Sequence, residues 1–133
     1  MKTLTYLILS IGLFAFSCKE ETSSNEPCIT GKIVGQKCDV FALQLDQKLL
    51  GATDWTKKDL LTGDIIATYP NVIGLINLPA EFRLDNKIIF VTLREPTVAE
   101  SQISCYLDMP NPPAPYYVVL SANETKCPET NNQ

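Results

Sequence analysis

The positions of the cysteines most constrain what this chain can fold into. Five cysteines occur, at positions 18, 28, 38, 105 and 127, and an odd number leaves at least one thiol outside any intramolecular pair. Cys18 differs from the others because an apolar stretch, residues 4–16, precedes it. The remaining four can form two disulfides, which persist in an oxidising compartment. The cysteines therefore predict a small exported domain closed by two disulfides.

The N-terminal segment has the features of an export signal. Lys2 supplies a positive charge, and the apolar stretch after it is shorter than the roughly 20 residues of a membrane span. Ala15 and Ser17 place small residues three and one positions before Cys18. The segment resembles a bacterial lipoprotein signal with its lipobox, from which it departs at Ala15 and at the bulky Phe16. Ordinary signal cleavage, which would leave a free thiol, is the alternative.

The lipoprotein resemblance implies a domain organisation and a location. Residues 1–17 are removed as signal peptide, Cys18 carries the acyl chains (palmitate among them), and residues 18–27 form a flexible tether. The lipid bilayer of the outer membrane is then one partner. Lys19, Glu20 and Glu21 resemble the surface-export signal of lipoproteins in some gram-negative lineages, which implies exposure on the cell surface; the alternative is a solvated polar tether.

Composition and motifs exclude several functional classes. The formal net charge is −4, and an acidic surface repels phosphate backbones, so nucleic acid is not an expected partner. Histidine is absent, which removes the commonest general base and the commonest zinc ligand. No calcium loop, zinc-type cysteine spacing, nucleophile elbow or phosphate-binding glycine loop occurs. We expect a protein that is not an enzyme and has no cofactor or metal.

Alternating apolar residues predict a mainly β domain over residues 28–133. Strands are expected at 29–34, 40–45, 65–68 with 72–78, 87–93 and 116–121, a short helix within 53–61, and one helical turn at 79–83. A long loop, 94–115, precedes the last strand. This order resembles a five-stranded OB-fold-like Greek-key barrel with a short helix between its third and fourth strands. Residues 71–82 also resemble a segment of uncharacterised envelope lipoproteins with such barrels, a family that implies no established activity.

The barrel resemblance selects one of the three possible disulfide pairings. In an OB barrel the loop between strands 1 and 2 and the loop between strands 4 and 5 lie at the same pole. Cys38 falls in the first loop and Cys105 in the second. The resemblance therefore implies a Cys38–Cys105 bond, which leaves Cys28 and Cys127 to join the two ends of the domain.

The same pole supplies the candidate binding residues. Tyr106, Met109, Tyr116 and Tyr117 cluster in or beside the proline-rich part of the long loop, and Trp55 is the single tryptophan. Aromatic side chains there can stack on sugars or hold a peptide. The alternative is that the tyrosines alternate across the last strand and that Trp55 packs on the core.

The expected function is that of a lipid-anchored, non-enzymatic envelope protein that binds a protein, peptide or glycan through this pole. A rigid loop braced by a disulfide is also how inhibitors of extracellular hydrolases reduce the ordering cost of binding. Inhibition of such a hydrolase is therefore one alternative, and a structural subunit of an envelope complex is another.

Overall fold

A computed structural model describes residues 27–105 and 112–127 of the chain. These residues form a mainly β structure, as the alternating pattern predicts. The six strands are β1 (Cys28–Lys37), β2 (Val40–Leu45), β3 (Thr53–Lys58), β4 (Ile65–Ile76), β5 (Ile88–Arg94) and β6 (Tyr116–Asn123). A three-residue 3-10 turn, Ala80–Phe82, lies between β4 and β5. Among the described residues, no helix is long and apolar enough to cross a membrane.

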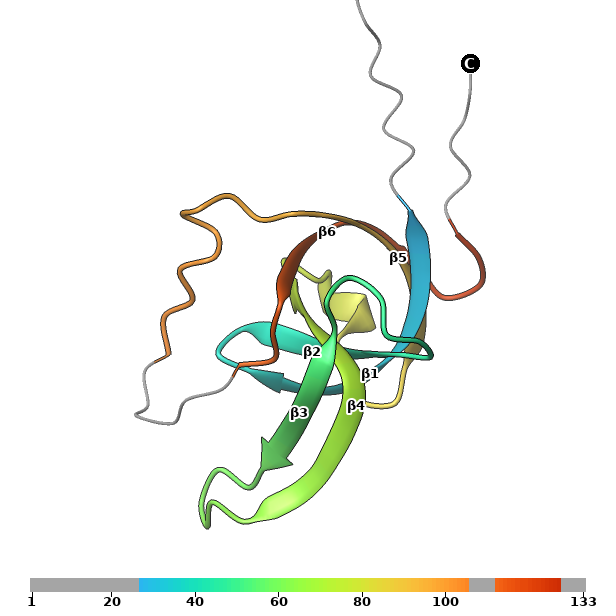
Figure 1. Ribbon diagram of the computed structural model, residues 1–133. Helices are drawn as coiled ribbons and strands as arrows, with labels where there is room; N and C mark the ends of the chain where they lie inside the picture. The colour runs from blue at the N-terminus through green and yellow to red at the C-terminus, as the bar shows by residue number, and fades with distance from the viewer. Residues whose placement is uncertain (1–26, 106–111, 128–133) are drawn as a thin grey trace, which may run out of the picture.

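Five of the strands pair in a ring (Figure 1). β1 pairs with both β2 and β5, and β5 pairs with β6, all antiparallel. β6 lies parallel to the second half of β4, and β2 pairs with that half on its other side. The sheet is ring-like rather than a barrel, because β3 and the first half of β4 continue beyond the five-stranded part.

The inside of the ring is the main hydrophobic core. Successive side chains of a strand point to opposite faces, so alternate residues of each strand enter the ring. Ile33, Leu43, Ile73 and Ile89 show this from four strands, and all four are fully buried. At about 1.5–3 kcal/mol for each large aliphatic side chain removed from water, this core supplies most of the stability of the domain.

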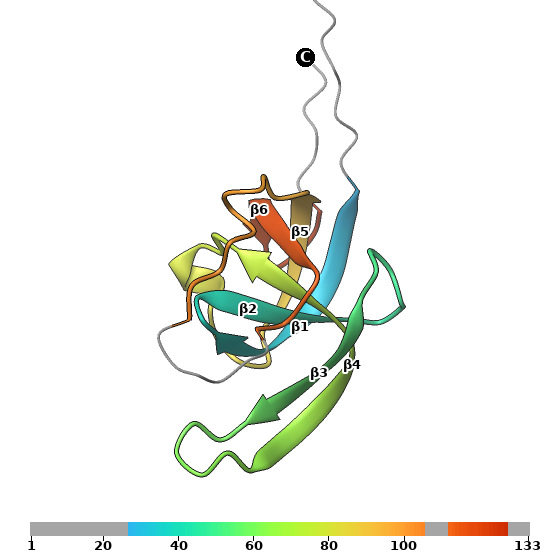
Figure 2. The same ribbon diagram turned by 60° about the vertical axis from the view of Figure 1, so that its left-hand side comes forward.

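β3 and the first half of β4 form a two-stranded arm that projects from the ring (Figure 2). The strand pairing shifts between Thr53 and Trp55, where Pro70 and Asn71 lie opposite a single residue of β3. Asn71 has a φ of 56°. Proline lacks the N–H that a regular ladder uses, so a bulge is the place where a strand accepts it. The bulge therefore marks the point at which β4 leaves the ring and enters the arm.

Both disulfides join the pairs that the barrel resemblance implied. Cys28 and Cys127 are bonded with Cα atoms 5.8 Å apart, and Cys38 and Cys105 with Cα atoms 5.0 Å apart. Cys38 and Asp39 form the two-residue turn between β1 and β2, with φ values of 54° and 63°. Positive φ at both positions is typical of the tight hairpin turn that matches strand twist.

Three expectations about the elements are corrected by the structure. Residues 53–58 form a strand rather than the start of a helix, because pairing with β4 overrides a weak local preference. Residues 65–76 are one continuous strand rather than a strand interrupted at 69–71, since the bulge accommodates Pro70 without ending it. Because residues 53–58 add a strand, the sheet has six strands instead of five. Where one helical turn was expected, at 79–83, only the short 3-10 turn occurs.

Candidate ligand-binding groove

A row of paired residues crosses the outer face of the ring. Lys32 of β1 lies opposite Ile88 of β5 on one side and opposite Gln44 of β2 on the other. Gln44 in turn lies opposite Val72 of β4. Because the inward neighbours of these residues fill the core, Lys32 and Gln44 point outward. Register thus places residues from four strands, far apart in the sequence, side by side on one surface.

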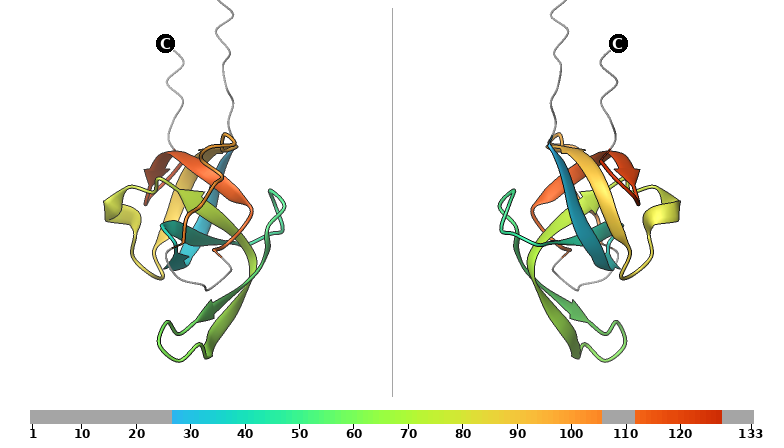
Figure 3. Two further views of the ribbon diagram at one scale, coloured as in Figure 1. Left: turned by 90° about the vertical axis from the view of Figure 1, so that its left-hand side faces the viewer. Right: turned by 90° about the vertical axis from the view of Figure 1, so that its right-hand side faces the viewer.

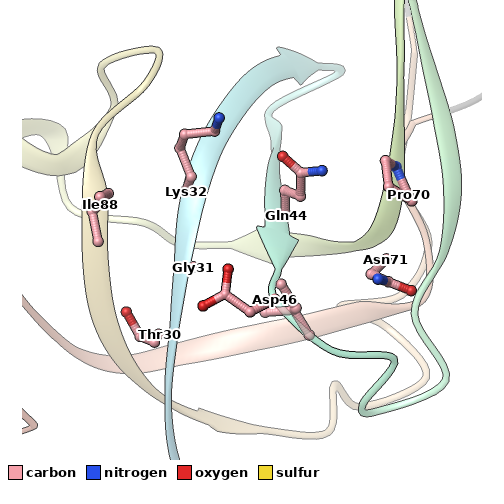
Figure 4. A pocket seen from close by; sticks show the side chains of 9 residues that line it. Thr30, Gly31, Lys32, Gln44, Asp46, Pro70, Asn71 and Ile88 are labelled. Carbon is pink, nitrogen blue, oxygen red and sulfur yellow. The ribbon is translucent and has the colours of Figure 1, made fainter.

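This row is part of a groove with a volume of about 450 Å³. In Figure 4, Ile88 and Thr30 stand on one side, and the bulge residues Pro70 and Asn71 stand on the other. The Asp46 carboxylate, from the end of β2, points towards β1 beside Gly31. The full lining comprises Thr30, Gly31, Lys32, Gln44, Leu45, Asp46, Pro70, Asn71 and Ile88.

Four of the five polar side chains that line the groove have no hydrogen-bond or ion-pair partner among the described residues. Within the described residues, no hydrogen bond or ion pair engages the side chains of Lys32, Gln44, Asp46 or Asn71. Thr30 donates its hydroxyl to the Ile89 carbonyl oxygen over 3.2 Å. The groove therefore offers one ammonium group, one carboxylate and two amides, which together donate and accept hydrogen bonds in a space walled by Pro70 and Ile88.

Trp55 closes the adjoining part of the same outer face. It is only 5% exposed and packs with Val34, Ala42 and Val72 in a second hydrophobic cluster. The Tyr69 ring lies nearly parallel to it, with ring centroids 6.4 Å apart. The indole of Trp55 therefore packs between the arm and the ring of strands. Trp55 also lines a smaller groove of about 260 Å³ beside Pro112 and Ala114.

Tyr117 and Tyr116 lie at the pole of the long loop, with different partners. Tyr117 packs against the core of the ring and donates its hydroxyl to the Leu50 carbonyl oxygen over 2.9 Å. Tyr116, the neighbouring residue, is half-buried, and burial raises its pKa above the usual value. The side chain of Tyr117 is thus occupied within the domain, and the two tyrosines do not form a common exposed aromatic surface.

The first part of the long loop is braced by ionic and backbone contacts. The Arg94 guanidinium donates to both Glu100 carboxylate oxygens over 2.8 Å. The Thr97 N–H donates to the same carboxylate over 2.8 Å, and the Ser101 N–H donates to the Thr97 carbonyl oxygen. The hydrogen bonds from Arg94, followed by that from Thr97, lower the pKa of Glu100 to about 2. This segment has a defined local turn before it reaches Cys105.

Several residues predicted from the sequence lie outside the described part of the chain. These are the lipidation residue Cys18, the export residues Lys19, Glu20 and Glu21, and the loop residues Tyr106 and Met109. Of the five candidate binding residues, the described ones are Trp55, Tyr116 and Tyr117, and none lines the large groove. Across residues 27–105 and 112–127, no group of three side chains is arranged to hold a metal ion.

Sequence reasoning missed the groove because its residues do not form a motif. Alternation along residues 29–34 and 40–45 already indicates that Lys32 and Gln44 share the face opposite the apolar side chains. Which residues of β4 and β5 stand beside them depends on strand register, and a single sequence does not provide that. Comparison with known proteins adds no relative: neither a protein-family model nor a curated protein sequence matches this chain.

Proposed function

We propose that this chain is a lipid-anchored protein of the bacterial outer membrane and that its domain binds a glycan without catalysing a reaction. The apolar stretch before Cys18 and the small residues at positions 15 and 17 support the anchor. Lys19, Glu20 and Glu21 support export of the anchored domain to the cell surface. The absence of histidine throughout the sequence supports a role other than acid–base catalysis.

The ring is proposed to be an OB-fold-like Greek key with one added strand. Support comes from the pairing order β1–β2–β4–β6–β5 and back to β1, in which the only parallel pair is β4 with β6. In this proposal β4 corresponds to the third strand of such a fold, and β3 is an addition before it. The groove then lies on the face of the second and third strands, the face through which such folds bind oligonucleotides and oligosaccharides.

The observation that carries the glycan proposal is the set of unengaged polar side chains in the groove. A sugar presents many hydroxyl groups, each of which both donates and accepts hydrogen bonds. The amides of Gln44 and Asn71 can do both as well, while Asp46 accepts and Lys32 donates. Oligonucleotides fit less well, because the chain as a whole is acidic.

A titration with variants of the full chain tests the ligand class. The probes are a panel of neutral oligosaccharides and a panel of short peptides, each titrated by calorimetry into the detergent-solubilised protein. We expect saturable binding of an oligosaccharide, weakened about thirtyfold in a Gln44→Ala, Asp46→Ala double variant. Two lost hydrogen bonds at on the order of 1 kcal/mol each amount to roughly 2 kcal/mol, and each step of about 1.4 kcal/mol is tenfold in affinity. The matched control is Lys48→Ala, an exposed position outside the groove.

Two outcomes would contradict the glycan proposal. One is the absence of saturable binding for every oligosaccharide tested. The other is equal affinity in the double variant and in the control, which would place the ligand elsewhere on the domain.

Metabolic labelling tests the anchor independently of any ligand. Cells that produce the full chain are fed labelled palmitate, and a Cys18→Ser variant is the comparison. We expect label in the wild-type chain only, together with digestion of the domain by a protease that does not enter intact cells. Label in the Cys18→Ser variant would contradict the anchor, and protection from protease in intact cells would contradict surface exposure.

A further inference from the structure

The tip of the arm carries an exposed apolar cluster. Leu60 is 63% exposed, Leu61 96%, Ile65 67% and Ile66 57%. Single exposed apolar residues are common on protein surfaces, but four large ones within seven positions at the end of a projecting hairpin form a patch. Exposed apolar patches of this kind mark sites of interaction.

The turn between β3 and β4, residues 59–64, is held in one conformation by its own hydrogen bonds. The Asp59 carboxylate accepts the N–H groups of Leu61 and Thr62 over 2.8 and 2.9 Å. The Asp59 N–H donates to the Asp64 carbonyl oxygen over 2.8 Å, and the Gly63 N–H donates to the Asp59 carbonyl oxygen over 3.0 Å. Gly63 has a φ of 77°, which glycine adopts without strain. The leucines are thus displayed by an ordered turn.

The base of the arm is held against the ring by side-chain packing and by hydrogen bonds. Trp55 packs directly over Gly35 of β1, where an added Cβ would lie 2.9 Å from the indole. The Lys57 ammonium donates to the Asp85 carboxylate over 2.6 Å and to the Val34 carbonyl oxygen over 3.2 Å. A surface that is already ordered loses less conformational entropy on binding, so the arm is suited to presenting its tip to a partner.

The tip lies at the end of the domain opposite to the start of β1, as both views in Figure 3 show. Under the proposed function, on which this step depends, nine residues, 19–27, separate Cys28 from the lipidated Cys18. The tether therefore joins the domain at one end, and the tip lies at the opposite end.

Charged side chains of both signs flank the leucines and limit what the tip can enter. Lys58 is exposed beside Asp59 and lies opposite Ile65 in the strand pairing. Asp59 and Asp64 stand at the two ends of the turn. Backbone hydrogen bonds from Thr62 and Leu61 lower the pKa of Asp59, so this group is ionised at neutral pH. Charged side chains of either sign are costly to place in hydrocarbon, which argues against insertion of the tip into a bilayer.

We propose that the apolar cluster of the arm docks into a pocket on a second protein. This pocket is apolar inside, and its rim carries basic side chains opposite Asp59 and Asp64 and an acidic side chain opposite Lys58. Leu60, Leu61, Ile65 and Ile66 together fill the pocket. Asp59 and Asp64 face the basic part of the rim. The partner therefore binds at the end of the domain opposite to the start of β1 (Figure 3). This surface is separate from the glycan groove, which lies on the ring.

Site-specific photocrosslinking of the full chain in the cells that produce it tests the proposal. A photoreactive residue replaces Leu61, and the matched control places it at Leu120, which is 47% exposed on β6. We expect a protein adduct from position 61 and none of the same mass from position 120. Sequencing of the adduct identifies the partner and locates the crosslinked pocket.

Variants decide whether the adduct depends on the proposed chemistry. We expect an Ile65→Ser, Ile66→Ser double variant to lower the adduct yield at least about tenfold, as loss of a central apolar anchor does in other interfaces. Asp64→Lys is expected to lower the yield about two- to fivefold by opposing a basic rim, while the uncharged Asp64→Asn falls between it and the wild type.

Each other outcome overturns the docking proposal. An adduct with phospholipid assigns the tip to a membrane, and an adduct with the chain itself assigns it to self-association. Equal adducts from positions 61 and 120, or no adduct from either, remove the tip as a specific surface. Partition of the same chain into a detergent phase reports the lipid anchor separately, so failure of the docking proposal is distinguishable from failure of the anchor.

Discussion

The two halves of β4 contain the same type of side chain in opposite environments. Ile73, in the second half, is fully buried inside the ring. Ile65 and Ile66, in the first half, are more than half exposed on the arm. The second half is paired with β2 and β6, whereas the first half has only β3 beside it. One strand can thus hold the fold together at one end and present an interaction surface at the other, with the bulge at Pro70 and Asn71 separating the two roles.

The largest expected effect contrasts one isoleucine from each half. Ile73→Ala should lower the free energy of unfolding by about 2–5 kcal/mol, because it leaves a cavity in a closely packed core. Ile66→Ala should change it by less than about 0.5 kcal/mol, because the side chain already contacts water. Urea unfolding at a common pH measures both. Similar losses in the two variants would mean that the arm belongs to the cooperative core, and the division of β4 would be wrong.

An intermediate effect is expected at the junction of ring and arm. Gly35→Ala places a methyl group against the Trp55 ring, and crowding of this kind typically costs about 1–3 kcal/mol. We expect faster amide hydrogen exchange in β3 and the first half of β4 than in β5, because the arm must shift while the ring remains intact. Ser101→Ala, an exposed change far along the chain, is the control. Equal acceleration of amide hydrogen exchange in all strands of the sheet would show that the arm does not open separately from the ring.

The smallest expected effect concerns the stability of the turn at the tip of the arm, and it depends on pH. The hydrogen bonds from Thr62 and Leu61 lower the pKa of the Asp59 carboxyl below its ordinary value of 3.8. Because this pKa is lowered, the Asp59 carboxylate stabilises the folded turn fully at pH values above 3.8. This stabilisation is lost as the pH falls through the lowered pKa.

The measurement is amide exchange at Leu61 and Thr62 in acid, corrected for the intrinsic pH dependence of exchange. Protection should fall at these two positions while Val91, in the ring, stays protected. An Asp59→Asn variant should show reduced protection at these amides already at neutral pH, without the acid-dependent loss. Unchanged protection at Leu61 and Thr62 across the acid range would contradict the proposed role of the carboxylate in the turn.

Sequence reasoning was most successful where local patterns and chain-level constraints agreed. Alternation found β1, β2, β5 and β6 within a few residues of their ends, and the barrel resemblance selected both disulfide pairs. It was wrong at β3, where Thr53 and Asp54 looked like helix caps, because the partner strand that stabilises this segment lies in β4. Local propensity cannot include such a contact.

The candidate sites were less predictable than the strands. Aromatic residues near the long loop were the natural candidates, yet the Tyr117 hydroxyl is hydrogen-bonded to Leu50 and Trp55 is buried between the arm and the ring. The groove depends on cross-strand register and the apolar tip on the direction in which the arm leaves the ring. Neither quantity is encoded in the spacing of residues along one strand. Exposed leucines in particular have the same sequence pattern as buried ones.

The most direct test of the account measures adduct formation and stability on the same double variant, Ile65→Ser with Ile66→Ser. The photoreactive residue is at position 61, and the free energy of unfolding is determined on the same purified protein. We expect the partner adduct to be lost while the free energy of unfolding stays within about 0.5 kcal/mol of the wild type, as for other exposed substitutions. Retention of the adduct, or its loss together with a large drop in stability, would contradict the claim that the arm presents an interaction surface that the fold itself does not need.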